Sequence, residues 1–330
     1  MQFYDAIKMN LSEQIHHLLH SCRRGSHHQK SLIKWFIKKR LLHGAPTCRV
    51  CRKEMKLTSY KSSDGYIWLC RRKGHRKVSS SVRKGSLFSQ SRVHLIKWLE
   101  FIYRFAQGLQ LRQIDMLEDK IASSSRTLSR MTNAIRKICV AALQRLRRRT
   151  GLRMGGKSRR KFISIDESKF AHKRKYNRGR FRSTWRRNSW VFGMLEIKGQ
   201  RRLPVLKIVK NRSRQTLVPI IRRHARRGST IFSDCWRAYA QALPRHGYRH
   251  FTVNHSENFV NPYTGCHTQH IERAWQSIKS QVNKQRGNKS KQLLKEHLKC
   301  IQWYQWLGKQ NKAGVLAQLF HDIRKHFKIC

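Results

Sequence analysis

Residues 162–168 are FISIDES, residues 229–236 are STIFSDCW and residues 267–275 are HTQHIERAW. Asp166, Asp234 and Glu272 each lie in one of these otherwise apolar or small-residue stretches. Carboxylates are scarce in this chain, which has 16 Asp plus Glu against 74 Lys plus Arg. Hard divalent cations such as Mg²⁺ prefer carboxylate oxygen, and phosphoryl transfer on nucleic acids uses such ions. The three acids are therefore the candidate metal ligands of a catalytic site.

The charge of the chain indicates a polyanionic partner. A formal net charge of +58 on 330 residues is self-repulsive without one. Hydrophobic residues make up 39% and aromatic residues 10%, which is enough to build cores, so the charge does not indicate global disorder. No apolar run approaches the length of a bilayer span, and the N-terminus lacks the apolar core of a signal peptide. We therefore expect nucleic acid, and no membrane, as the partner.

The cysteines argue against a secreted disulfide framework, because there are nine of them and they are spread irregularly. Cys48 and Cys51 form the only close pair. The other cysteines, apart from Cys70, are most simply reduced thiols in an intracellular compartment: Cys22, Cys139, Cys235, Cys266, Cys300 and Cys330.

Cys48, Cys51, Cys70 and His75 give the spacing C-x₂-C-x₁₈-C-x₄-H. The first three fit the knuckles of a zinc ribbon, and Cys₃His is an accepted structural zinc set. Asp64-Gly65 predicts a hairpin turn that leads into the second knuckle. The alternative is a small β-hairpin with buried free cysteines.

The first half of the chain is predicted to be helical around this module. Residues 1–45 carry Trp35, Phe36, Ile37 and Leu41 among basic residues, and the polar segment 21–30 is expected as a loop. Amphipathic helices are predicted over 92–107 and 125–148. Their apolar stripes are Leu95, Leu99, Ile102 and Ala106 in the first, and Leu128, Met131, Ile135, Ile138 and Ala142 in the second. A helix-turn-helix-like arrangement and an ordinary helical linker bundle are equally compatible with this pattern.

A basic joint with glycines at 145–161 separates this half from a region of alternating strands and helices. Strands are predicted at 162–167, 189–196, 203–209, 230–233 and 249–253. Helices are predicted at 213–226, at 236–243 (ending before Pro244) and at 268–282, where Thr268 is the N-cap candidate.

This order of elements is the ribonuclease-H-like order, an α/β fold with a mixed sheet flanked by helices. In that topology the first and fourth strands are neighbours, so Asp166 and Asp234 can meet although 68 positions separate them. Glu272 follows in the helix after the fifth strand. Each acid also has an ordinary explanation: Asp234 as a helix N-cap, Asp166 or Glu167 as a solvated loop acid, and Glu272 as a surface ion-pair partner.

Residues 161–282 resemble the catalytic domain of Merlin-type DDE transposases and their bacterial insertion-sequence relatives. The matching segments are IDESKF (165–170), KYNRGR (175–180), WVFGMLE (190–196), SDCWRAY (233–239) and VNHSENFVNPYTGCHTQHIERAW (253–275). Upstream, RKGSLFSQSRVHLIKW (83–98) is also similar to this family. Relatives usually have a cysteine near His75, so this chain departs from the family at the fourth zinc ligand.

The resemblance implies a DNA transposase that cleaves transposon ends and joins the 3′-hydroxyl to target DNA with two Mg²⁺ or Mn²⁺ ions. It implies Asp166, Asp234 and Glu272 as the catalytic, metal-binding triad, and the 37 residues between the last two suit such enzymes. We expect a homo-oligomer on transposon-end and target DNA, in the nucleus of a eukaryote or otherwise in the cytoplasm or nucleoid. The alternatives are a transposase-derived DNA-binding protein without catalysis and a basic RNA-binding protein.

Further DNA contacts are expected next to the triad. Lys279 lies seven residues after Glu272, on the same helical face. The basic stretch 172–187 joins the first two predicted strands and interleaves aromatic residues with cations, which suits a DNA clamp, although a solvated basic hairpin is the plainer interpretation. Its proposed phosphate-binding residues are Lys175, Arg178, Arg180 and Arg182.

These expectations divide the chain into five parts. They are a helical region (1–45), a zinc-ribbon-like module (46–80), a second helical region (81–150), the ribonuclease-H-like catalytic domain (161–285) and a helical tail (286–330).

Overall fold

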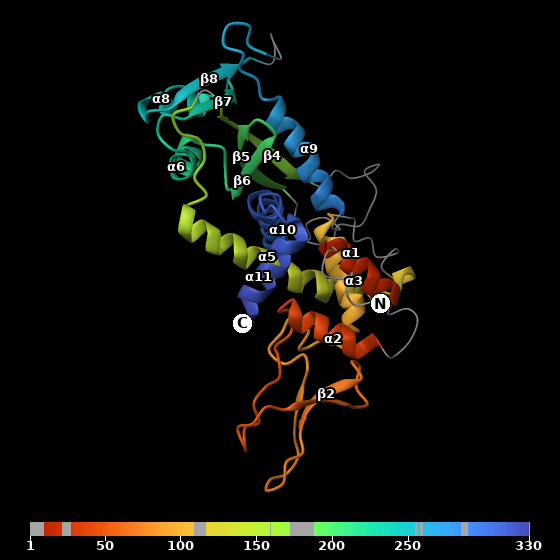
Figure 1. The fold of residues 1–330 in the computed structure, drawn as a ribbon. Helices are drawn as coiled ribbons and strands as arrows, with labels where there is room; N and C mark the ends of the chain where they lie inside the picture. The colour runs from red at the N-terminus through yellow and green to blue at the C-terminus, as the bar shows by residue number, and fades with distance from the viewer. Residues whose placement is uncertain are drawn as a thin grey trace. The chain divides into compact units, whose positions relative to one another are not determined.

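The computed structural model describes residues 10–21, 28–108, 117–158, 160–171, 188–235, 237–254, 257, 260–284 and 290–329. The chain divides into two compact units (Figure 1). The first holds residues 1–138 and 311–330, and the second holds residues 139–310. The division into five parts stays a prediction. No helix in the described residues is both long and apolar enough to cross a membrane.

The first unit combines helices with a small antiparallel sheet of order β1-β2-β3. Its helices are α1 (Leu11–Ser21), α2 (His28–Lys38), α3 (Leu95–Ala106) and α11 (Gly314–Phe327), and α5 (Ser125–Thr150) begins in this unit. Its strands are β1 (Lys56–Ser59), β2 (Tyr66–Cys70) and β3 (Val78–Ser81). Every residue of the two predicted apolar stripes, in α3 and α5, is buried.

The loop expected at 21–30 is wrong at both of its ends. Ser21 still belongs to α1, and α2 already begins at His28. The buried side chains of Leu32, Ile33 and Phe36 explain the early start, because tertiary packing of an apolar face extends a helix beyond what local propensity predicts.

The second unit is built on a mixed five-stranded sheet of order β6-β5-β4-β7-β8. Its strands are β4 (Phe162–Ala171), β5 (Asn188–Lys198), β6 (Arg201–Val209), β7 (Thr230–Asp234) and β8 (Arg249–Val253). β5 is antiparallel to both β4 and β6, whereas β7 runs parallel to β4 and β8 parallel to β7. The expected adjacency of the first and fourth strands is confirmed.

Helices lie on both sides of this sheet. They are α6 (Arg214–His224), α7 (Arg237–Ala240), α8 (Ala242–Arg245), α9 (Gln269–Lys284), α10 (Lys291–Trp303) and the π-helical turn η2 (Tyr304–Gly308). Figure 1 shows α9 along one side of the sheet and α6 on the other. The α9 side holds a core to which α10 also contributes, through Leu294, Leu298 and Ile301.

The prediction that a helix over 236–243 stops before Pro244 is wrong. The structure has two short helices there, and Pro244 lies inside α8. Because α8 begins at Ala242, Pro244 is in the first turn, where a backbone N–H has no partner within the helix.

Gly193 of β5 provides the space for the largest side chain of α9. It is the register partner of Asp166 in β4. A Cβ atom at Gly193 would lie 2.4 Å from Cζ2 and 2.6 Å from Cη2 of Trp275, closer than packed carbon atoms approach. A glycine at this position therefore lets the Trp275 indole lie directly against the strand.

We expect the substitution Gly193→Ala to lower the free energy of unfolding by about 1–3 kcal/mol, because the added methyl forces the indole out of its place. Gly44→Ala is the control. A Cβ atom added at Gly44 would have no heavy atom within 4 Å, and the φ of Gly44 is not in the left-handed region. Urea unfolding of both variants measures the difference. Equal stabilities of the two variants would contradict the prediction.

Candidate functional site

Asp166 and Asp234 lie at equivalent positions of adjacent parallel strands. The register pairs Ile163 with Ile231 and Ser164 with Phe232, a constant offset of 68 positions that also relates Asp166 to Asp234. Successive side chains of a strand alternate between the two faces of a sheet, so both carboxylates lie on the same face as Phe162 and Phe232. These two rings stack with their centroids 4.4 Å apart.

That face is the one that α9 covers, and α9 holds the carboxylate of Asp166 directly. Trp275 Nε1 donates a hydrogen bond of 2.9 Å to Asp166 Oδ2. The backbone amide of Glu167 donates a bond of 2.7 Å to Asp166 Oδ1. Each carboxylate oxygen thus has one donor, and the orientation of the group is set by the helix and by its own strand. Asp166 is half-buried in β4, not a solvated loop acid.

The charges of the other two acids act on Asp166. The pKa of Asp166 is raised to about 6, mainly by burial, and the negative charges of Asp234 and Glu272 contribute to the rise. The hydrogen bonds from the Glu167 amide and from Trp275 oppose the rise in this pKa. A site that concentrates negative charge in this way is suited to bind cations.

Glu272 lies in the first turn of α9, after the fifth strand, as the sequence predicts. Thr268 Oγ1 donates a bond of 2.5 Å to Glu272 Oε1, and the Thr268 carbonyl accepts the Glu272 amide at 3.1 Å. Lys279 is further along the same helix, and its ammonium group lies 5.9 Å from the centroid of the Phe170 ring. Its proposed contact with DNA stays a prediction.

Glu167 is a neighbour of the site that the sequence did not assign. It is half-buried, and its Oε1 accepts a hydrogen bond from the hydroxyl of Tyr239, a fully buried residue in α7. Burial raises the pKa of Glu167 to about 8, and the charges of Asp166 and Asp234 add to the rise. The sequence offers no signal for the Tyr239 contact, since the two residues are 72 positions apart.

The predicted phosphate-binding residues Lys175, Arg178, Arg180 and Arg182 lie outside the described residues. The same holds for all of the basic stretch 172–187. Their role therefore remains an expectation from the sequence.

Cys48, Cys51, Cys70 and His75 converge in the first unit. Their ligand atoms all lie within 4.8 Å of one another, and among the described residues no other group of three or more His, Cys, Asp or Glu side chains is as close. The Cys51 and Cys70 sulfurs are 3.7 Å apart, and His75 Nε2 is 3.6 Å from Cys70 Sγ and 3.9 Å from Cys48 Sγ. A tetrahedral zinc ion with Zn–S of ~2.3 Å requires ligand separations of about 3.6–3.8 Å.

The orientation of His75 also suits metal ligation. Its Nδ1 lies 2.6 Å from the Arg76 carbonyl oxygen, which can only accept, so Nδ1 carries the proton and Nε2 faces the sulfurs with a free lone pair. The pKa of the Cys51 thiol is lowered to about 6, mainly because the Cys51 sulfur forms a hydrogen bond with the backbone of Lys53. Thiolates are the form that binds zinc.

The strands around this cluster form the predicted hairpin. Asp64 and Gly65 lie in the β1–β2 turn, and Gly65 has a φ of 69°. Asp64 is buried and accepts two bonds from Arg83, from Nε at 2.6 Å and from Nη2 at 2.5 Å. This bidentate pair fixes the turn to the segment after β3.

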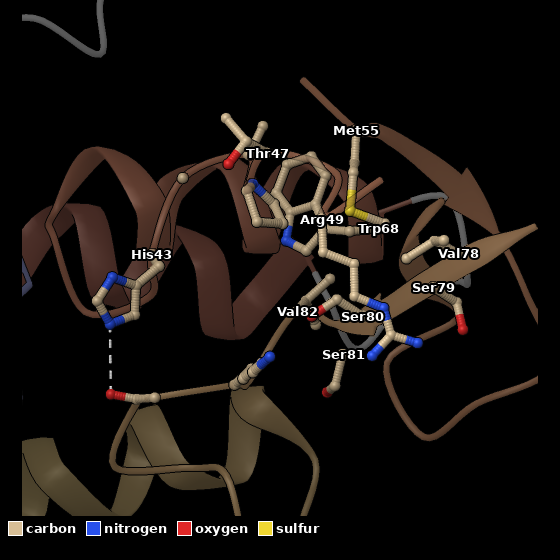
Figure 2. A pocket seen from close by; sticks show the side chains of 15 residues that line it. His43, Thr47, Arg49, Met55, Trp68, Val78, Ser79, Ser80, Ser81 and Val82 are labelled. Atoms are coloured by element: carbon tan, nitrogen blue, oxygen red, sulfur yellow. Dashed lines mark hydrogen bonds between the residues drawn. The ribbon is translucent and has the colours of Figure 1, made fainter. Parts of the chain in front are cut away.

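A cavity of about 570 Å³ lies beside the cysteine module (Figure 2). Trp68, Met55 and Val78 line it together with the guanidinium group of Arg49, and His43 Nε2 lies 3.3 Å from the Gly85 carbonyl oxygen. The four metal-ligand candidates are not among the described residues that line it. The cavity and the candidate metal site are therefore separate features of this unit.

A known protein family matches part of the second unit. Residues 159–305 match the family model of the ISXO2-like transposase domain. No curated protein matches the chain. A chain in the cryo-EM structure of the simian T-cell lymphotropic virus intasome, in complex with the PP2A regulatory subunit B56 gamma, is 15% identical with a TM-score of 0.29. The match covers 51% of this chain and 58% of that one, and a TM-score this low supports no statement about fold or function.

The matched residues include strands β4 to β8 and helix α9, and with them Asp166, Asp234 and Glu272. It agrees with the resemblance seen in the segments that surround Asp166, Asp234 and Glu272. The chain therefore contains a DDE transposase-type domain.

Proposed function

We propose that this protein is a DNA transposase that cuts the ends of a mobile element and joins the freed 3′-hydroxyl to target DNA. The observation that carries the proposal is the placement of the three acids: Asp166 and Asp234 lie on one face of the sheet, and Glu272 lies on α9, the helix that covers this face. Asp166 and Asp234 occupy equivalent positions on adjacent parallel strands, and the charge of Glu272 acts on Asp166. The strand order β6-β5-β4-β7-β8 supports a ribonuclease-H-like fold for this unit.

The donor set of the site fits Mg²⁺ or Mn²⁺, because it consists of carboxylate oxygens. Asp166, Asp234 and Glu272 would hold two such ions. Because the ligands are divided between two ions, the three carboxylates do not have to surround a single metal position. When bound, two divalent ions activate the attacking oxygen and stabilise the leaving oxygen of a phosphodiester.

The residues of the chain supply the positions for this chemistry. The Glu167 amide and the Trp275 indole hold the Asp166 carboxylate in one orientation, and the Thr268 hydroxyl holds Glu272. Water attacks the phosphorus in the first reaction and the 3′-oxygen leaves as a hydroxyl. In the second reaction that hydroxyl attacks a phosphodiester of target DNA, and the 3′-oxygen of the target strand leaves as a hydroxyl. No serine or tyrosine forms a covalent bond to DNA.

The Cys48, Cys51, Cys70 and His75 cluster holds a structural zinc ion in this proposal. Its ligand separations support a tetrahedral site, and a site with four protein ligands leaves no open position for chemistry. The ribbon would therefore stabilise the first unit or contact DNA, without a part in the cut. The partners are transposon-end and target DNA, bound by a homo-oligomer in the nucleus of a eukaryote or otherwise in the cytoplasm or nucleoid.

We expect the variants Asp166→Asn, Asp234→Asn and Glu272→Gln each to lower DNA cleavage by orders of magnitude, because each removes a charged metal ligand. DNA binding should survive or tighten, since each change also removes a repulsion against phosphate. Nicking of a labelled transposon-end duplex in Mg²⁺ measures cleavage, and retention of the same duplex in Ca²⁺ measures binding.

Glu257→Gln is the control for these three variants, because Glu257 is an exposed acid with no assigned role. Glu167 does not serve as a control, since it is half-buried against Tyr239 beside the site. Undiminished cutting by the three variants, or an equal loss in Glu257→Gln, would show that the triad is wrongly assigned. Intact binding with no cutting by the parent would favour the non-catalytic alternative.

We expect Trp275→Phe to lower cleavage about ten- to hundred-fold, because the Asp166 carboxylate loses a donor and its orientation. The Mg²⁺ concentration that gives half-maximal cleavage should rise as well, which a purely structural role would not produce. Trp306→Phe is the matched control, since its indole donates a bond of 2.7 Å to the Pro204 carbonyl elsewhere in the same unit. An unchanged Mg²⁺ requirement in Trp275→Phe would argue against a positioning role.

Purified protein should contain about one zinc ion per chain, and a Cys48→Ser/Cys51→Ser double variant should lose it, because two of four ligands are removed. Elemental analysis of the dialysed protein measures this content. Cys235→Ser keeps the zinc, since that exposed cysteine lies outside the cluster. Absence of zinc from the parent protein would rule out the ribbon.

A further inference from the structure

Five arginines line a pocket of about 590 Å³ in the second unit, away from the carboxylates. They are Arg153, Arg222, Arg223, Arg226 and Arg227, and they define what we call the basic pocket. His246 and Tyr248 complete its polar lining. No Asp or Glu is among the described residues that line it. Such a concentration of cations without carboxylates is costly unless an anion occupies the pocket.

Several contacts hold these arginines around one buried ring. Arg226 Nη1 donates to the Gly155 carbonyl at 3.3 Å, and Arg153 Nε donates to the Arg223 carbonyl at 3.5 Å. Tyr248 is buried, and its hydroxyl donates to the Ala225 carbonyl at 3.3 Å. Burial raises the pKa of Tyr248, whereas the charges of Arg222, Arg153 and Arg227 oppose the rise. The guanidinium groups therefore lie close enough to one ring to act on it together.

A second group of cations continues from Arg223. The pKa of Lys207 in β6 is lowered to about 8, mainly by burial, and the charges of Arg147, Arg223, Lys299 and Lys295 contribute to the decrease. These four cations come from α5, α6 and α10, so the group is assembled by tertiary packing. Arg223 belongs to both groups, because it lines the basic pocket and its charge acts on Lys207.

The basic pocket lies near the start of β7 and β8, whereas Asp234 lies at the end of β7. Arg227 precedes the first residue of β7, and Tyr248 directly precedes β8. Asp234 is the last residue of β7. Five residues of extended chain span roughly 13–17 Å. One phosphodiester therefore does not contact both places.

We propose that the basic pocket binds backbone phosphates of a duplex DNA segment other than the phosphodiester that is cut. Arginine pairs with phosphate through two parallel hydrogen bonds, and a pocket lined by five arginines offers partners to more than one of the repeated phosphates of a duplex. The inference rests on the proposed function for the identity of the partner. It adds a second DNA site, which contributes to binding and does not take part in the cut.

The test compares two double variants of the full chain. Arg222→Ala/Arg226→Ala removes two arginines of the basic pocket. Lys198→Ala/Arg201→Ala removes the same charge from exposed residues that flank the β5–β6 turn. Duplex DNA affinity is measured in Ca²⁺ at several salt concentrations. We expect the pocket variant to bind several-fold more weakly, with a log–log salt slope about 2 smaller in magnitude, and the control to change little.

Cleavage of saturating DNA in Mg²⁺ distinguishes this site from the catalytic one. The pocket variant should cut saturating DNA at the parent rate, because its loss is in affinity. Equal weakening of both variants would mean that general charge and not the pocket binds DNA, and parent-like affinity and slope would remove the site. Tripolyphosphate that binds the parent pocket while both variants keep parent affinity for DNA would assign the pocket to a small anion instead.

The same measurements separate this proposal from the proposed function. A parent protein that binds DNA and does not cut it contradicts the catalytic proposal, and the affinity comparison still tests the pocket. A pocket variant that both binds and cuts like the parent contradicts only the second site.

Discussion

The hydrogen bond from Trp275 to Asp166 is the contact on which the candidate site depends. It joins α9 to the central strand of the second unit across 109 positions of sequence. The indole reaches Asp166 because Gly193, on the neighbouring strand, has no side chain to occupy that space. Since Glu272 is on the same helix one turn before Trp275, the bond that orients one carboxylate also fixes the helix that carries another.

The few carboxylates of this basic chain have specific structural partners. Asp64, in the β1–β2 turn, forms an ion pair with Arg83. On α3, Glu100 accepts a hydrogen bond of 2.9 Å from Arg104. In the second unit, Glu196 accepts the Gly155 amide at 2.6 Å. Acids that serve these contacts are not available to neutralise the many surface cations. The positive charge therefore remains largely uncompensated within the described residues, and the basic pocket concentrates part of it.

The two candidate metal sites differ in how they are built. The Cys₃His cluster takes its ligands from 28 consecutive residues, 48–75, that form one short meander, so local spacing brings them together. The acids instead come from β4, β7 and α9 and reach one side of the sheet only when the sheet and its covering helix are assembled. A closed set of soft thiolate ligands suits a structural ion. Hard carboxylate oxygens instead suit divalent ions that also coordinate a substrate.

The local pattern of the sequence determined much of this protein. Alternation and apolar periodicity predicted the five strands and the stripes of α3 and α5, and the turn residues Asp64-Gly65 predicted the hairpin, because each depends on residues close together in sequence. The strand order placed Asp166, Asp234 and Glu272 correctly in β4, β7 and α9. Propensity failed at Pro244, because a residue that breaks one helix is tolerated in the first turn of another.

Only the tertiary structure decided what surrounds these residues. The pairing of Trp275 with Asp166, the burial of Glu167 against Tyr239 and the approach of Arg153 and Tyr248 to the arginines of 222–227 leave no signal in sequence spacing. Each depends on side chains from separate elements whose distances are set by packing. Spacing along a chain predicts which residues share an element, whereas the contacts between elements, and the pKa shifts that follow from them, are fixed only by the folded core.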